Sequence, residues 1–147
     1  MTLPAAASLA AIMTQLVAVE GMVDPRVRVY RWRPENVPEL PAIYNWLGDS
    51  PAEWLNVCAL QETLTINARL AVRHSDVGDE MDLLEDLADR FREVVDQQLT
   101  RTGGPLGGVK YAARTGMRNV IDRFGDVPVL ALEFPLAVRV QRTVQPL

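Results

Sequence analysis

The strongest constraint on the fold of this 147-residue chain is an alternation of apolar and polar residues over residues 63–74. Apolar side chains occupy every second position: Leu64, Ile66, Ala68, Leu70 and Val72. The positions between them include Thr65, Asn67, Arg69 and Arg73. Because successive side chains of a β-strand point to opposite faces, the pattern predicts a long strand with one buried face and one polar face.

A second long alternation runs over residues 127–142, with apolar residues at Leu130, Leu132, Phe134, Leu136, Val138 and Val140. Pro135 interrupts this run and has no backbone N–H to donate. We therefore expect the strand to be bulged, or to lie at a sheet edge, near the proline. The turn signal Phe124-Gly125-Asp126 precedes it, so residues 109–121 and 127–142 are predicted to form a β-hairpin.

Two segments have the period of an amphipathic helix. The first has its apolar stripe at Leu9, Ile12, Met13, Leu16 and Val17, and Gly21 marks its end. The second covers residues 79–100, with a stripe at Leu84, Leu87, Ala88, Phe91, Val94 and Val95. Acidic residues crowd the first turns of this second helix and arginines follow later, which complements the helix dipole.

Residues 26–33 and 42–47 are further strand candidates, and residues 52–61 fit either a short strand or a loop. The elements therefore follow the order α-β-β-β-α-β-β. The whole chain, residues 1–147, has the length of a single domain with one core. Long antiparallel strands and two amphipathic helices predict an α+β fold, in which a mostly antiparallel sheet has both helices packed on one face.

Composition disfavours several classes of protein. The formal net charge is -4, so no dominant positive field marks a nucleic-acid binder. Cys58 is the single cysteine and cannot form an internal disulfide; a small buried side chain is favoured over a nucleophile. The N-terminal apolar run has no Lys or Arg before it, which argues against a secretory signal. No stretch reaches the roughly eighteen apolar residues of a membrane span, so we expect a soluble, intracellular-type chain.

The one histidine, His74, precedes the acids Asp76, Asp79, Glu80 and Asp82, and this cluster is the first place to look for a metal or acid–base site. A closed zinc site needs four ligands, usually several of them His or Cys, and the pattern of a calcium loop is absent. A simpler interpretation is a strand-to-helix corner, in which residues 75–78 turn the chain and the acids lie at the positive end of the helix. We expect no metal, no cofactor and no catalytic residues here.

The glycine-rich segment "TGGPLGGVK" follows the second helix and precedes a strand. A phosphate-binding loop of the Walker type lies between a strand and a helix and ends in G-K-[ST], so the segment is interpreted as a flexible loop. No G-x-S-x-G elbow is present either. The chain is therefore not expected to be an enzyme.

Contact surfaces are the remaining candidates for function. Four arginines alternate along one segment with Tyr30 and Trp32: Arg26, Arg28, Arg31 and Arg33. They could bind phosphates or an acidic partner, or they could guard an exposed strand edge against unwanted pairing. Trp54 and the acids Asp79, Glu80 and Asp82 are further candidate contact residues, because polar strand faces with scattered tryptophans suit protein contacts.

The elements together have a recognisable arrangement. A short helix is followed by an R-V-x-x-W/Y strand, the proline-bracketed "ELPAIYNWL", a T-x-T-x-x-x-x-L-x-V strand, an acidic-to-basic helix and "VPVLALEFPLAVRVQR". From Leu9 to Arg142 the chain resembles the tail terminator proteins of long-tailed bacteriophages and phage-like particles, also called tail-completion or minor tail proteins. These motifs are patterns of size and alternation, and they contain no catalytic signature.

This resemblance implies a structural virion protein of the tail and neck, assembled in the host cytoplasm. Such proteins form a homohexameric ring on the head-proximal end of the tail tube, stop tube polymerisation and dock the head-tail connector. Their partners would be further copies of the chain, the tail tube protein and the connector or stopper, while DNA would pass non-specifically through the lumen. Two alternatives stay open: a stopper or adaptor protein of the neck, and a small metal-dependent enzyme using His74 and Asp76.

Overall fold

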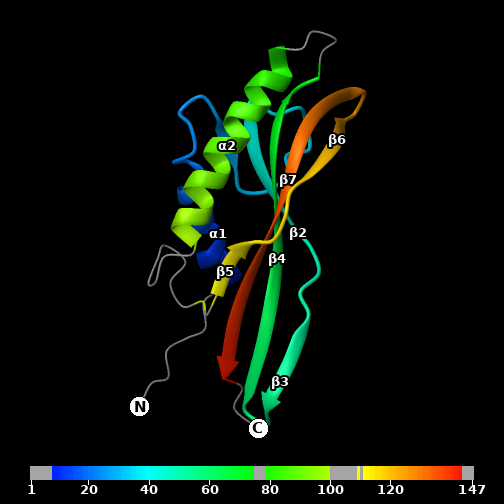
Figure 1. The fold of residues 1–147 in the computed structure, drawn as a ribbon. Helices are drawn as coiled ribbons and strands as arrows, with labels where there is room; N and C mark the ends of the chain where they lie inside the picture. Colours follow the sequence, from blue (N-terminus) through cyan, green and yellow to red (C-terminus); the bar gives the residue numbers. More distant parts are fainter. Residues whose placement is uncertain (1–7, 75–78, 100–108, 110, 144–147) are drawn as a thin grey trace.

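The computed structural model describes residues 8–74, 79–99, 109 and 111–143. Within these residues two helices and a mixed, mostly antiparallel sheet of seven strands form an α+β fold (Figure 1). The elements are α1 (Leu9–Glu20), β1 (Arg28–Tyr30), β2 (Ala42–Leu47), β3 (Ala52–Asn56), β4 (Ala59–Arg73), α2 (Asp79–Leu99), β5 (Tyr111–Arg114), β6 (Arg118–Phe124) and β7 (Val127–Thr143). The predicted fold class and element order are confirmed. The ambiguous segment contributes β3, and the predicted strand 109–121 is divided into β5 and β6.

Two long strands, β4 and β7, form the centre of the sheet. They pair antiparallel in unbroken register from Ala59 opposite Thr143 to Arg73 opposite Val129. Toward the Arg73 end of this pair, β2 pairs with the far side of β4 and β6 with the far side of β7. Toward the Ala59 end, β3 pairs with β4 and β5 with β7. β1 pairs parallel with β2 and forms an edge. Each central strand is therefore flanked by two shorter strands that follow one another along its length.

The apolar side chains of both alternations lie on the sheet face that α1 and α2 cover. The five apolar positions predicted for β4 are all buried in one cluster with residues of both helices and of β7. Phe91 of α2 stacks on Phe134 of β7, with ring centroids 4.2 Å apart. Complete burial of one such side chain stabilises the fold by about 1.5–3 kcal/mol. The shared buried cluster holds both helices on one face of the sheet, as predicted.

The helix ends follow from local chemistry. Ser8 caps α1, since its hydroxyl oxygen accepts a hydrogen bond from the backbone N–H of Ala11 at 3.1 Å. α2 begins with Asp79, Glu80 and Asp82 in its first turn, where the helix dipole favours negative charge. No helix among the described residues is long and apolar enough to cross a membrane.

The opposite face of the sheet holds a second, smaller core. Tyr44, Ala71, Phe124, Val129 and Ala131 are buried together there, and the rings of Tyr44 and Phe124 meet edge to face at 5.7 Å. Tyr44 belongs to β2 and Phe124 to β6, which β4 and β7 separate in the sheet. The sheet must therefore curl toward this face. Arg69 lies on the face of β4 opposite the apolar side chains, as predicted, but the curl buries it there.

The structure also revises two local predictions. The predicted strand 26–33 shortens to Arg28–Tyr30, although the backbone N–H of Arg33 still donates to Asn45 O of β2 at 2.9 Å. Pro135 does not bulge β7 toward β4 and does not lie on an edge strand; its carbonyl accepts a hydrogen bond from Thr115 N at 2.8 Å. Thr115 lies in the gap between β5 and β6. The interruption near the proline therefore occurs in the strands that pair with β7, and β7 itself is continuous.

Candidate interaction surfaces

The four arginines predicted as one contact row are directed to different parts of the molecule. Arg26 forms an ion pair with Asp24 at 2.9 Å, and Arg28 forms one with Glu39 at 2.7 Å. Arg31 donates to the carbonyl oxygen of Ala10 in α1 at 2.8 Å. Arg33 pairs with Asp122 at 3.0 Å. The structure therefore does not bring these residues together as a basic surface, and each guanidinium has a partner within the chain.

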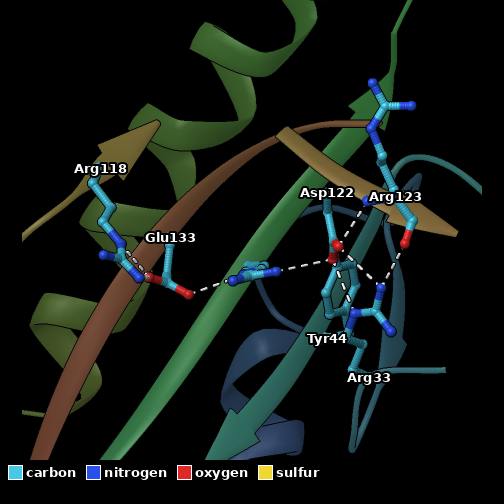
Figure 2. A network of polar contacts seen from close by, with 7 residues as sticks. Arg33, Tyr44, Arg118, Asp122, Arg123 and Glu133 are labelled. Carbon is cyan, nitrogen blue, oxygen red and sulfur yellow. Dashed lines mark hydrogen bonds and ion pairs between the residues drawn. The ribbon is translucent and has the colours of Figure 1, made fainter. Parts of the chain in front are cut away.

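Arg33 is the first member of a row of alternating charges on the curled face. Asp122 accepts hydrogen bonds from Arg33 at 3.0 Å, from Arg69 at 2.9 Å and from the Tyr44 hydroxyl at 2.6 Å. Arg69 also donates to Glu133 at 2.9 Å, and Glu133 accepts from Arg118 through its second oxygen. Figure 2 shows these contacts running from Arg118 and Glu133 to Asp122, Tyr44 and Arg33. We call this set the charge row.

Strand register explains why the charge row forms. Tyr44 lies opposite Arg69, Arg69 opposite Glu133, and Glu133 opposite Arg118, so four strands place these side chains on one line across the sheet. Two of the arginines stack on aromatic rings. The guanidinium carbon of Arg69 lies 4.5 Å from the ring centroid of Trp46, and that of Arg33 lies 4.3 Å from the ring centroid of Phe124.

The electrostatics of the charge row favour a structural role. Burial alone would raise the pKa of Asp122, but the hydrogen bonds from Arg33 and Tyr44 outweigh it and hold that pKa well below its usual value. Both oxygens of Glu133 are engaged by arginines. Two buried acids with their acceptor atoms occupied stabilise the curl of the sheet and present no free base to a substrate.

Sequence reasoning did not identify Arg69, Asp122 and Glu133 as a set. One signal was present, since Glu133 is the single acid in the seventeen residues of β7. The set could not be read from the sequence, because Arg69 lies 64 positions from Glu133 and 53 positions from Asp122, and only the register and the curl bring these residues together.

The acidic cluster after β4 does not assemble into a metal site in the part of the chain that the structure describes. His74 is exposed at the end of β4, Asp79 and Asp82 are exposed on α2, and Asp76 lies outside the described residues. Within residues 8–74, 79–99, 109 and 111–143, no three His, Cys, Asp or Glu side chains are grouped closely enough to hold a metal ion. His74 and Glu80 do line a common groove of about 640 Å³ with the 37–41 segment.

Trp54 lies on β3, whose one pairing partner among the described residues is the start of β4. Together β3, the turn after it and the start of β4 form what we call the arm, residues 52–62, which extends past both helices (Figure 1). Three large apolar side chains are exposed on it: Trp54 at 58%, Leu55 at 48% and Val57 at 89%. A sheet edge with adjacent exposed apolar residues is suited to contact with another protein.

Cys58 lies in the same arm and is partly buried, and its backbone N–H donates to the Asn56 side chain at 2.8 Å. This bond closes the turn that presents Val57. The arm is thus a structured hairpin. The sequence matches no protein-family model and no curated protein.

Proposed function

We propose that the chain is a structural protein of the tail-terminator type, which caps the head-proximal end of a phage tail tube as a ring, stops tube polymerisation and provides the docking surface for the head. The observation that carries this proposal is the arm. An arm that exposes Trp54, Leu55 and Val57 is costly to leave in water, and its exposed apolar residues are explained when another protein covers them.

The position of the arm favours assembly into a ring. It lies at one end of the elongated sheet, away from the start of α2 and from β6 (Figure 1). A contact in which the arm of one subunit meets a different surface of the next is head-to-tail, and such contacts close into rings when the rotation permits.

The charges support protein partners over tight DNA binding. Arg26, Arg28 and Arg33 are paired with carboxylates of the same chain, and the formal net charge is -4. Phosphate binding would require these guanidinium groups to leave their partners. The proposed partners are therefore further copies of the chain, the tail tube protein and the head-tail connector, with DNA passing through the lumen non-specifically.

Assembly is tested by imaging and mass. The purified full-length protein is examined by negative-stain electron microscopy and by native mass spectrometry over a range of concentrations. We expect closed rings with one dominant stoichiometry, six copies according to the resemblance. A protein that stays monomeric at its highest soluble concentration would contradict the proposal.

Position in the particle is tested with two partners. Polymerising tail tube protein is mixed with the ring, and tube length is followed by light scattering. We expect tubes to stop growing at one end, with the ring visible there. A ring that leaves tube growth unchanged but binds the purified connector would instead identify a stopper or adaptor of the neck.

A further inference from the structure

The end of α1 is joined to the sheet by a buried pair of polar side chains, Glu20 and Asn45. Both residues are fully buried. The Nδ2 atom of Asn45 donates a hydrogen bond to Glu20 Oε1 at 2.7 Å. The two remaining acceptor atoms of this pair, Glu20 Oε2 and Asn45 Oδ1, are buried without a hydrogen-bond partner among the described residues. Buried acceptors are rarely left in this state, so the pair requires an explanation.

No cation of the described residues compensates a charge on Glu20. α1 contains no other charged residue, and β2 contains none. The arginines between α1 and β2 and those of α2 are engaged elsewhere: Arg26 and Arg90 with Asp24, Arg28 with Glu39, Arg31 with Ala10 O, Arg33 with Asp122, and Arg92 with Asp89. Glu20 is also the last residue of its helix, where the helix dipole disfavours negative charge.

We propose that Glu20 is held as a neutral carboxylic acid whose Oε2–H donates to Asn45 Oδ1, and that ionisation of this acid at alkaline pH releases the end of α1 from β2. A protonated carboxyl group and a primary amide are complementary, because each supplies one donor and one acceptor. The known Nδ2–Oε1 bond and the proposed Oε2–Oδ1 bond close one ring. Both orphaned acceptors are then satisfied by a single proton, and we call this arrangement the acid–amide clamp.

Burial raises the pKa of Glu20 from its usual 4.5 to about 8, although the hydrogen bond from Asn45 lowers it in part. The proton is therefore present at neutral pH and lost in mildly alkaline solution. After ionisation, Oε2 becomes a second acceptor beside Oδ1, and a buried charge is left without a partner. The clamp then loses one bond and the remaining contact is strained by repulsion.

The first test observes the proton directly. The full-length protein is labelled with ¹³C at the glutamate Cδ, and Glu20 is assigned by its absence in Glu20→Gln. We expect the Glu20 resonance to titrate with a midpoint near 8, well separated from the acidic midpoints of ordinary glutamates. A Glu20 resonance that titrates together with the other glutamates in acid would overturn the proposal.

The second test separates the clamp from general alkaline effects. In Glu20→Gln the new amide can make both hydrogen bonds to Asn45 but cannot ionise. The matched control is Glu85→Gln, because Glu85 is exposed on α2. From about pH 6 to about pH 9 we expect the Tm of the wild type and of Glu85→Gln to fall relative to that of Glu20→Gln. Parallel Tm profiles for all three proteins would exclude the clamp. If Glu20→Gln folds poorly, the wild-type resonance is assigned by through-bond experiments and the titration decides alone.

Discussion

Arg69 on β4 lies 2.9 Å from Asp122 Oδ2 on β6, although β7 separates these two strands in the sheet. The contact is possible because the sheet curls over its second core, and Arg69 at the same time holds Glu133 on the intervening strand. One guanidinium therefore fixes three strands at the level where the curl is greatest. We therefore expect the curl to be less stable when one member of the charge row is removed.

Replacement of Arg69 by Met is expected to destabilise the protein by about 3 kcal/mol. This value is at the lower end of the range for removing one member of a buried ion pair, because Asp122 and Glu133 each keep one other arginine. Urea unfolding at neutral pH measures the loss. The matched control is Arg28→Met, which breaks an exposed pair with Glu39 and should leave the free energy of unfolding nearly unchanged. Equal effects of both substitutions would contradict the structural role of the charge row.

Acid should weaken the fold through Asp122. Its pKa in the folded protein is lowered, so the carboxylate contributes stability above the usual aspartate pKa of about 3.9, and that contribution disappears as the pH falls toward the lower folded value. Asp122→Asn lacks this linkage. The wild type should be clearly more stable than the variant at neutral pH, and the difference should shrink as the pH is lowered below about 4. A difference that stays constant down to acid pH would show that Asp122 is not ionised in the fold.

The sequence predicted the elements whose hydrophobic period decides their environment. β4 and α2 were located because their apolar residues repeat at two and at about three and a half residues, and a single buried face satisfies each pattern. The burial of Arg69 was not predicted, for a related reason. The alternation tells which side of the strand it lies on, while the curl that buries that side arises from contacts between β2 and β6. Trp54 was identified as a contact candidate from composition, but only the pairing of β3 shows that it lies on an arm.

The tight turn between β6 and β7 should be sensitive to a side chain at one position. Gly125 has a φ of 64°, a conformation that costs L-residues about 1–2 kcal/mol, so Gly125→Ala should lower the free energy of unfolding by about 1 kcal/mol. Gly125→Asn should cost less, because asparagine tolerates this region. Gly116→Ala serves as control, since an added Cβ there meets no atom within 4 Å. Thermal unfolding of the three variants compares the turn directly; a Gly125→Ala as stable as Gly116→Ala would contradict the expected strain.

A double-mutant cycle should reveal the coupling of Glu20 and Asn45. Either single replacement by Leu leaves a buried polar partner unsatisfied and should cost about 1–3 kcal/mol. The double replacement removes both polar groups and should cost less than the sum of the two single effects. Free energies from urea unfolding near pH 6 supply the cycle. Additive losses would mean that the two side chains stabilise the protein independently, against the single unit inferred for the clamp.

The arm should determine assembly while contributing little to the subunit itself. Trp54 is mostly exposed, so Trp54→Ser should leave the Tm of the dissociated subunit almost unchanged. In the assembly, loss of a buried tryptophan anchor typically costs 2 kcal/mol or more, which corresponds to association weakened by about thirty-fold or more.

Trp32→Ser is the matched control, because Trp32 is likewise an exposed tryptophan but lies outside the arm, between β1 and β2. Sedimentation velocity across a concentration series should show rings for the wild type and Trp32→Ser, and smaller species for Trp54→Ser. If Trp54→Ser forms rings at the same concentration as the wild type, Trp54 does not anchor the subunit contact. If Trp32→Ser is equally impaired, the contact is not specific to the arm.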